Sequence, residues 1–308
     1  RNAPPALVEA ADLVSEMVLE FDDLQGIMGR YYALHDGESA EVAAAMFEHY
    51  LPRFAGDSLP ETITGTTIAL ADRLDTLVGI FGIGQPPSGS RDPFALRRAA
   101  LGVLRILVEK RIDLNLRETL DRAAALHPGL TVTSGLGEQV LTYLFERFRA
   151  WYGDDGISSE VFMAVLAKEL DNPLDFHLRV QAVHAFSQLA EAGNLAAANK
   201  RVSNILAKSD AVLPGAVDPA LFEKAEESAL LEAVAATAAQ VAPMFSSRDY
   251  SSAMKVLDVL REPVDNFFDQ VMVMAEDERI KLNRLKLLSE LRSLFLNVAD
   301  ISLLVPAK

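Results

Sequence analysis

The sequence contains no cysteine, a single tryptophan and only 7% aromatic residues. The missing cysteines exclude a disulfide framework and any thiolate metal site. The chain also lacks the Gly-Lys-Ser/Thr phosphate loop, the Gly-x-Ser-x-Gly nucleophile elbow and the HExxH metal motif, which removes the enzyme classes that depend on them. We find no signal-peptide pattern and no uninterrupted apolar run of membrane-spanning length, and therefore predict a cytoplasmic protein without membrane contact.

Positive charge is also scarce. The 308 residues include 29 Lys and Arg against 44 Asp and Glu, a net charge of −15, which argues against a general nucleic-acid binder. The imbalance is uneven, because residues 1–180 carry 16 basic and 27 acidic side chains, whereas residues 181–308 carry 13 and 17. A local basic face in the second part could still bind RNA, since binding depends on the charges near the phosphates.

Half of the residues are hydrophobic, and Ala and Leu dominate them. Apolar residues recur at spacings of three and four along most of the chain, which predicts an all-α fold. The expected helices cover Leu7–Met28, Glu41–Tyr50, Thr66–Phe81, Pro93–Arg111, Leu116–Leu126, Leu136–Trp151, Ser159–Leu170, Asp175–Ala192, Leu195–Lys208, Pro219–Phe245, Tyr250–Arg261, Val264–Val273 and Ile280–Val298.

Proline- and glycine-rich segments separate these helices, at Leu51–Pro60, Gly82–Ser90, Gly153–Gly156 and Asn172–Pro173. Such residues favour turns and interrupt helices. We place a domain boundary near Asp171–Asp175, which divides the chain into residues 1–174 and 175–308.

The run RDPFALRRAALGVLRILVEK, from Arg91, has a marked helix start. Asp92 can cap the free backbone N–H groups, and Pro93 suits the first turn. Arg97 falls on the apolar side of this helix and needs a polar partner if it is buried. We therefore predict a structural ion pair in which Arg97 is buried within salt-bridge distance of Asp72 or Asp75, with Arg73 as the alternative cation.

The same run resembles the β subunit of bacterial glycyl-tRNA synthetase. The resemblance extends to EFDDLQGIMGRYYA from Glu20, LADRLDTLVGIFGIGQ from Leu70, AAANKRVSNILAKSD from Ala196, REPVDNFFDQVMVMAED from Arg261 and NRLKLLSELRSLFLNVADISLL from Asn283. The β subunit of that family is a much longer chain, so the sequence resembles its C-terminal portion. The resemblance implies an HD-like helical domain followed by a helical-bundle anticodon-binding domain.

His35-Asp36 is an adjacent pair of the type found in HD metal phosphohydrolases, and LADRLDTL resembles the helix that carries their distant aspartate. A metal site needs several converging ligands, but no histidine precedes His35. In the synthetase resemblance Ala11-Asp12 fits the His-Asp position better, so an alanine replaces a ligand. We predict no catalytic and no metal-binding residue, and keep an HD-type metal-dependent phosphohydrolase with a helical accessory domain as the alternative function.

A basic stripe lies between Ala196 and Asp210. On a helix Lys200, Asn204 and Lys208 align at i, i+4 and i+8, with Arg201 beside them. Cations and an amide on one face suit phosphate and base-edge contacts, although a solvated helix face has the same spacing. The segment resembles the start of a DALR-type anticodon-binding domain. We predict Lys200, Arg201, Asn204, Lys208, Arg279 and Arg284 as the tRNA-binding residues, with Arg284 either paired internally or lining a cleft.

The resemblance implies one part of an ATP-dependent glycine–tRNA ligase. In that family the α subunit carries the aminoacylation site, where ATP and magnesium are expected, so we expect no cofactor in this fragment. The implied partners are glycine tRNA and the α subunit, in a hetero-oligomer of α and β. The fragment alone is expected to lack the catalytic site and to hold glycine tRNA for reaction in the α subunit.

Overall fold

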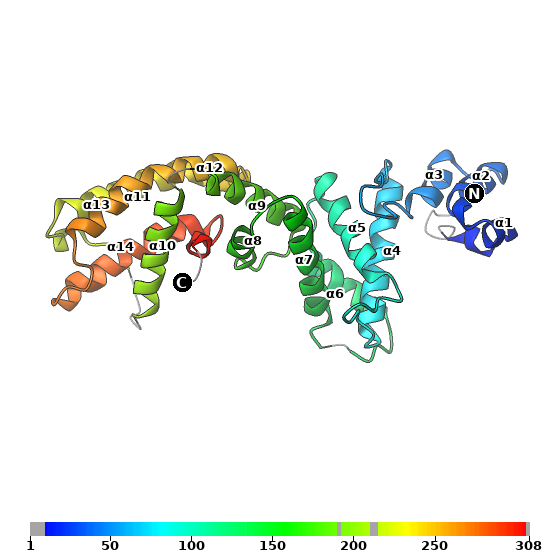
Figure 1. Ribbon diagram of the computed structural model, residues 1–308, viewed down its shortest axis with the longest axis horizontal. Helices are drawn as coiled ribbons and strands as arrows, with labels where there is room; N and C mark the ends of the chain where they lie inside the picture. Colours follow the sequence, from blue (N-terminus) through cyan, green and yellow to red (C-terminus); the bar gives the residue numbers. More distant parts are fainter. Residues whose placement is uncertain (1–9, 133, 190–191, 210–214, 306–308) are drawn as a thin grey trace. The chain divides into compact units, whose positions relative to one another are not determined.

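The computed structural model describes residues 10–132, 134–189, 192–209 and 215–305. Across these ranges the chain forms helices joined by loops and no β-strand; a lone bridge joins Ser88 and Arg91. The all-α prediction is confirmed (Figure 1). The chain divides into two compact units, one of residues 1–151 with 171–174 and the other of residues 152–170 with 175–308.

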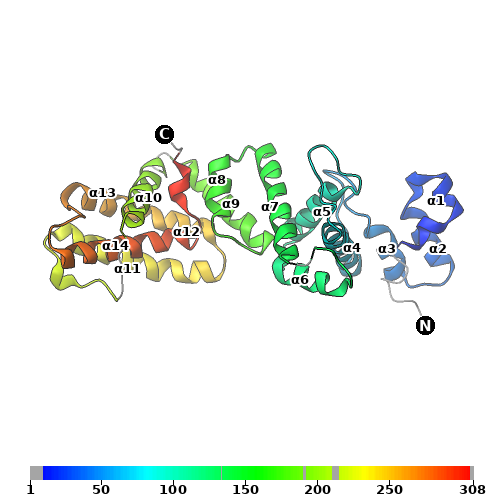
Figure 2. The same ribbon diagram turned by 90° about the horizontal axis from the view of Figure 1, so that it is seen from below.

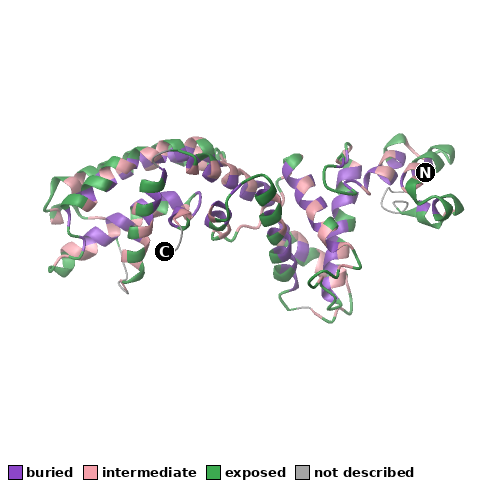
Figure 3. Cartoon of the chain, in the orientation of Figure 1, coloured by how far each residue is buried: buried purple, intermediate pink, exposed green. Residues whose placement is uncertain are grey.

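The first unit has a core around α4 (Ile63–Gly82) and α5 (Leu96–Glu109), which pack against each other. Figure 3 shows buried positions along both helices. Leu77, Leu104 and Leu107 have no exposed surface. The other elements of this unit are η2 (Ala11–Val14), α1 (Glu16–Glu20), η3 (Asp22–Leu24), α2 (Ile27–His35), α3 (Ala40–Glu48), α6 (Leu116–Leu126) and most of α7 (Leu136–Asp154).

The prediction of one helix over residues 7–28 is wrong for its described part, and residues 7–9 lie outside the described residues. The segment is broken into η2, α1, η3 and the start of α2. Ser15 is extended and caps α1 through Val18, while Gly26 has a φ of +77°. A side chain at Gly26 would also place Cβ 2.8 Å from Tyr50 Cδ2. Apolar periodicity does not register such breaks, because each short piece keeps its helical spacing.

Local capping sets the starts of the two central helices. Thr62 accepts a hydrogen bond from the Gly65 amide at the N-terminus of α4, and the buried Glu48 carboxylate accepts from the Thr62 amide at 3.1 Å. Asp92 caps α5 as predicted, through the Leu96 and Arg97 amides at 2.8 and 2.9 Å. The helix nevertheless begins at Leu96 and not at Pro93, because Ala95 takes the left-handed conformation (φ 54°).

The second unit is a helical bundle. In Figures 1 and 2, α11 and α14 lie side by side, and α11 also packs against α12 and α13. The helix α10 packs against α13, α14 and the C-terminal 3-10 turn. The elements are α8 (Ser159–Leu166), α9 (Pro173–Ser187, from Asp175 onward), α10 (Ala192–Ala207), η4 (Pro219–Leu221), α11 (Ala225–Ser246), α12 (Tyr250–Leu257), η5 (Asp258–Leu260), α13 (Arg261–Gln270), α14 (Glu278–Leu296) and η6 (Ile301–Leu304).

Contrary to the sequence-based expectation, α11 is long and apolar enough to span a membrane by length and composition. Its contacts, however, are those of a bundle helix. It packs against α12, α13 and α14, and it buries the ionised Glu227 in a pair with Arg284. The ionised pair lies in the interior of the bundle, where protein groups replace the water around each charge.

Candidate nucleic-acid interface

The predicted basic stripe lies on α10 and the turn that follows it. Arg201, Asn204 and Lys208 are exposed. The Arg201 guanidinium lies 4.1 Å from the centre of the Phe268 ring on α13, a cation–π contact that holds the charge at the surface. Lys200 is only half-exposed and its Nζ donates to the Val305 carbonyl at 3.0 Å. The face therefore offers two exposed cations and one amide, while Lys200 also ties α10 to the C-terminal segment.

The two residues of α14 predicted to bind tRNA, Arg279 and Arg284, differ in their exposure to solvent. Arg279 is exposed in the first turn, where Asp277 caps the helix. Arg284 is only 4% exposed. Its guanidinium pairs with Glu227 at 2.8 Å and Glu223 at 2.9 Å and donates to the Met272 carbonyl at 3.0 Å. The internal pairing that was one of the two predicted alternatives for Arg284 is confirmed. Its assignment as an RNA-facing residue is wrong for this fold, because its donors are used inside the bundle.

The Arg284–Glu227 pair is held in its ionised form. Burial alone would raise the pKa of Glu227, but hydrogen bonds from Arg284 and from the Glu223 and Lys224 amides outweigh it and lower the pKa. The hydrogen bond to Glu227 raises the pKa of Arg284 in turn. Charge-assisted bonds of this kind are among the strongest in proteins, so the pair anchors α14 to the N-terminal end of α11.

The predicted pair between Arg97 and Asp72 or Asp75 does not form. Arg97 is half-exposed and its guanidinium donates to the Gly89 carbonyl. Asp72 and Asp75 are exposed, and Asp75 accepts from His127 Nε2 at 2.7 Å. The helix start at Leu96 lets the long Arg97 side chain turn back along the preceding loop, away from the apolar interior. A helical wheel gives only the position of the Cα atom around the helix and does not show where a long side chain such as that of Arg97 ends.

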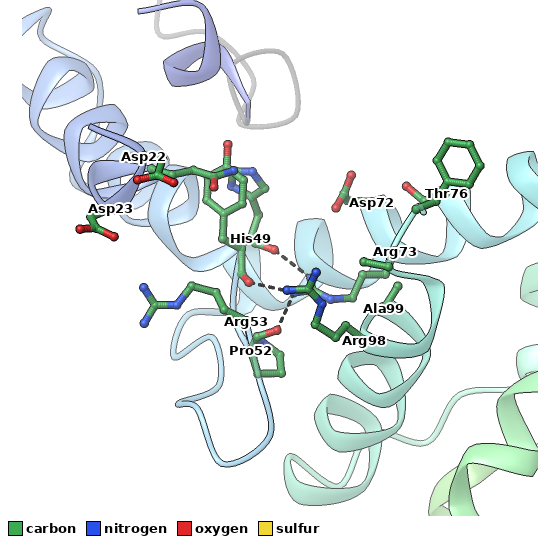
Figure 4. A pocket seen from close by; sticks show the side chains of 14 residues that line it. Asp22, Asp23, His49, Pro52, Arg53, Asp72, Arg73, Thr76, Arg98 and Ala99 are labelled. Carbon is green, nitrogen blue, oxygen red and sulfur yellow. Dashed lines mark hydrogen bonds between the residues drawn. The ribbon is translucent and has the colours of Figure 1, made fainter. Parts of the chain in front are cut away.

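Arg73, on α4 in the first unit, is buried at 8% exposure. It has no salt bridge among the described residues; instead Nη1 donates to the carbonyls of His49 and Ala69, both at 2.8 Å, and Nη2 to those of Tyr50 (3.0 Å) and Pro52 (3.2 Å). Figure 4 shows the Arg73 guanidinium directed at the His49 and Pro52 carbonyls. Burial lowers its pKa, and the nearby Asp72 charge counteracts part of this shift. Arg73 therefore fixes the chain that leaves α3 against α4.

Neither candidate for the HD position, His35-Asp36 or Ala11-Asp12, lies in a group of metal ligands among the described residues. His35 and Asp36 are both largely exposed at the end of α2. Asp12 is buried and accepts from the Gly26 amide and, at 2.9 Å, from the Tyr50 hydroxyl. Within the part of the chain that the structure describes, no three His, Asp or Glu side chains are grouped to hold a metal ion.

A polar cluster around Tyr250 in the second unit is not among the predicted sites. The Tyr250 hydroxyl donates to Asp175 at 2.6 Å and accepts from Arg179 at 2.7 Å. Arg179 also pairs with Asp175 at 2.8 Å and donates to the Val298 carbonyl. The cluster thus joins α9, α12 and the segment that follows α14. The i,i+4 spacing of Asp175 and Arg179 was the available signal, but it is common on solvated helices.

Tyr250→Phe is expected to lower the free energy of unfolding by about 1–3 kcal/mol at pH 7, because Asp175 and Arg179 each lose a buried partner. Burial and the bond to Asp175 raise the pKa of Tyr250 to about 12. In the unfolded chain the phenol ionises near pH 10. The unfolded state therefore loses this proton at a lower pH than the folded state does, and the free energy of unfolding falls between about pH 10 and 12. Urea unfolding across this range should show a shallower fall for Tyr250→Phe. An unchanged slope, equal to that of the exposed control Tyr31→Phe, would contradict it.

Two segments of the chain match models of known protein families. Residues 195–302, which include α10, the bundle around α11 and α14, and the exposed basic face, match the family model described as the DALR anticodon binding domain. The chain is thus a helical protein with a domain of the anticodon-binding class. Residues 3–167 match the model of the glycyl-tRNA synthetase beta subunit, and the chain belongs to that family.

The curated relatives of the chain belong to the same family. The glycine–tRNA ligase beta subunit of Marinobacter nauticus is 56% identical over 313 residues, covering 99% of this chain and 45% of the relative. Those of Chromohalobacter salexigens and Pasteurella multocida are 57% and 53% identical, each with 43% of its own length covered. The chain therefore spans less than half the length of the curated relatives it matches.

Proposed function

We propose that this chain is the tRNA-binding portion of a glycyl-tRNA synthetase β subunit and that it positions glycine tRNA for aminoacylation in the active site of the α subunit. The observation that carries the proposal is the match of residues 195–302 to an anticodon-binding domain, on a unit whose α10 face exposes Arg201, Asn204 and Lys208.

The proposed interface has the chemistry that an RNA loop needs. Arg201 and Lys208 supply exposed cations for phosphates, and Asn204 between them supplies an amide that can both donate to and accept from a base edge. Arg279 on α14 is a further exposed cation of the same unit. The chain as a whole carries a net charge of −15, which disfavours nonspecific binding of phosphates away from the basic face.

The mechanism of this portion is positioning. Contacts made far from the reacting atoms contribute binding energy that can orient the 3′ end of the tRNA toward the catalytic subunit. In this proposal ATP and magnesium act in the α subunit, the hetero-oligomer of α and β is the working enzyme, and it works in the cytoplasm. Residues 1–174 are the degenerate HD-like domain and residues 175–308 the DALR-type domain.

The alternative of an HD-type phosphohydrolase has no support. Ala11 offers no ligand atom, Asp12 is used by Gly26 and Tyr50, and no metal-binding group of side chains occurs in the described ranges.

The test is binding of the 308-residue chain to glycine tRNA across a salt series, with the double variant Arg201→Gln/Lys208→Gln beside the wild type. If both cations contact phosphates, the slope of log affinity against log salt should fall by about 2, and affinity near physiological salt should drop about tenfold or more. A glycine tRNA with a substituted anticodon should bind more weakly than the unchanged tRNA to both proteins, because phosphate contacts carry no sequence information and the double variant keeps Asn204.

The matched control is Arg30→Gln/Lys255→Gln, which removes the same charge from two exposed positions off the α10 face. Equal losses in the two double variants would mean that only net charge matters, and the proposed interface would be abandoned. Binding indifferent to both the variant and the anticodon would have the same consequence.

A further inference from the structure

Arg201, on the exposed basic face of α10, is stacked on an aromatic ring of the neighbouring helix. The helices α10 and α13 pack against each other (Figure 2), and the Arg201 guanidinium lies over the Phe268 ring, 4.1 Å from its centre. Phe268 in turn meets the Phe267 ring edge-on, with the two ring centres 5.6 Å apart. Phe267 has no exposed surface. The Arg201 side chain therefore rests on a ring that the interior of the bundle holds in place.

Other arginines of the chain lie over aromatic rings, but their donors are used within the fold. Arg53 is of this kind and pairs with Asp57 at 2.9 Å. Arg179 is another and pairs with Asp175 at 2.8 Å. Arg201, by contrast, is exposed, and no carboxylate or carbonyl of the described residues accepts a hydrogen bond from it. The stack thus positions a guanidinium whose N–H groups and outer face are available to a ligand.

A guanidinium held in this way is suited to an unpaired RNA base. A long side chain normally loses rotamer freedom when it binds a ligand, whereas Arg201 has already lost part of that freedom against the ring. Unpaired bases of RNA stack on aromatic rings and on guanidinium planes. Because the group is planar and its donors lie along its edge, Arg201 can hold a base on its outer face and still pair with a phosphate.

The charges on the two helices distinguish a place for the base from a place for the backbone. Asp265 precedes Phe268 by one turn of α13 and Asp269 follows it, and both are exposed. Carboxylates repel phosphates but accept hydrogen bonds from the amino groups of bases. Lys208, directly after the end of α10, lies about 10 Å beyond Arg201 along the helix axis. We therefore expect the base over Arg201 and the phosphates on the side of Lys208.

We propose that Arg201 and Phe268 form a stacking platform for one unpaired base of the anticodon loop. The base packs on the outer face of the guanidinium, and Phe268 supports the opposite face. Asn204, one turn further along α10, bonds the edge of the same base. This inference rests on the proposed function, because it assigns a base contact to the same α10 face. It adds that the shape of Arg201, and not its charge alone, holds the loop.

The test is binding of the 308-residue chain to the anticodon stem-loop of glycine tRNA, with each loop nucleotide in turn replaced by an abasic one. An abasic nucleotide keeps its phosphate but cannot stack. At one loop position or more, this change should weaken binding to the wild type about tenfold, the usual cost of one lost stack.

Arg201→Lys keeps the charge and loses the planar face. It should bind the unmodified loop about tenfold more weakly than the wild type does. Removing the stacked base should then weaken binding to this variant by no more than about twofold, because the two changes remove the same contact. The slope of log affinity against log salt should equal that of the wild type, since the number of cations is unchanged.

Three further variants serve as controls. Phe268→Leu removes the supporting ring and should reduce the abasic penalty, whereas Phe268→Tyr keeps a ring and should bind like the wild type. Lys208→Arg, a matched exchange of one cation for another on the same face, should retain the full abasic penalty. Far-UV circular dichroism checks that each variant is folded, and the exposed Arg201→Lys tests the proposal even if Phe268→Leu unfolds the bundle.

The possible failures of the platform and of the proposed function differ. The platform is overturned if no abasic position weakens binding to the wild type, if Arg201→Lys keeps the full penalty, or if Phe268→Tyr loses as much affinity as Phe268→Leu. It is also overturned if glycine tRNA binds but its isolated anticodon stem-loop does not. In all these cases salt-dependent binding of glycine tRNA would still support the proposed function. If neither RNA binds the wild type, both proposals fail.

Discussion

Replacing Arg284 with methionine is expected to lower the free energy of unfolding of the second unit by about 3–5 kcal/mol, the typical effect of leaving one member of a buried ion pair without its partner. Glu227 has no exposed surface, and its carboxylate would lose both bonds from the guanidinium. The Met272 carbonyl would lose its donor as well. Methionine fills a similar volume, so the effect reports the charge and not a cavity.

Urea unfolding followed by far-UV circular dichroism measures this effect. The double variant Arg284→Met/Glu227→Gln should recover most of the loss, since glutamine is uncharged and can still accept from the Glu223 and Lys224 amides. Arg279→Met, on the same helix but exposed, should stay within about 0.5 kcal/mol of the wild type. If Arg284→Met behaves like Arg279→Met, the guanidinium contributes no net stability and the assignment of Arg284 as an anchor is wrong.

Arg73→Met is expected to lower the free energy of unfolding of the first unit by about 3 kcal/mol, because buried carbonyls that lose their only donor cost about 1–3 kcal/mol each. The Ala69 carbonyl keeps its place in α4, but those of His49, Tyr50 and Pro52 depend on the guanidinium. Relief of the desolvation of Arg73 offsets part of this cost. Lysine should not substitute, since one ammonium cannot reproduce the planar fork.

The single tryptophan, Trp151, belongs to the first unit. Its fluorescence during urea unfolding therefore measures the loss of stability of this unit in Arg73→Met. Arg97→Met is the decisive control, since Arg97 is the arginine whose helical position indicated burial. It should shift stability by no more than about 0.5 kcal/mol, as expected for a partly exposed side chain. A larger loss for Arg97→Met than for Arg73→Met would reverse the structural assignment.

The amino-acid sequence by itself determined the all-α class and most helix positions. Leu116–Leu126 forms a helix with the predicted bounds, and Asp92 caps α5 as expected. These features depend on residues within one or two turns of each other, so their spacing along the chain is sufficient to predict them. The long motifs that resemble the synthetase β subunit likewise identified the family from the sequence. The match over residues 3–167 confirmed that identification.

Only the tertiary structure decided which charged residues are exposed. Arg73, Arg97 and Arg284 all fall on helices. Sequence spacing indicated burial for Arg97 and left Arg284 either paired internally or lining a cleft. The partners that decide between these outcomes are distant in the chain: Arg284 meets Glu227 57 residues away, and Arg73 reaches carbonyls 21 to 24 residues away. A long flexible side chain is buried where remote groups replace its water, and spacing within one helix carries no information about those groups.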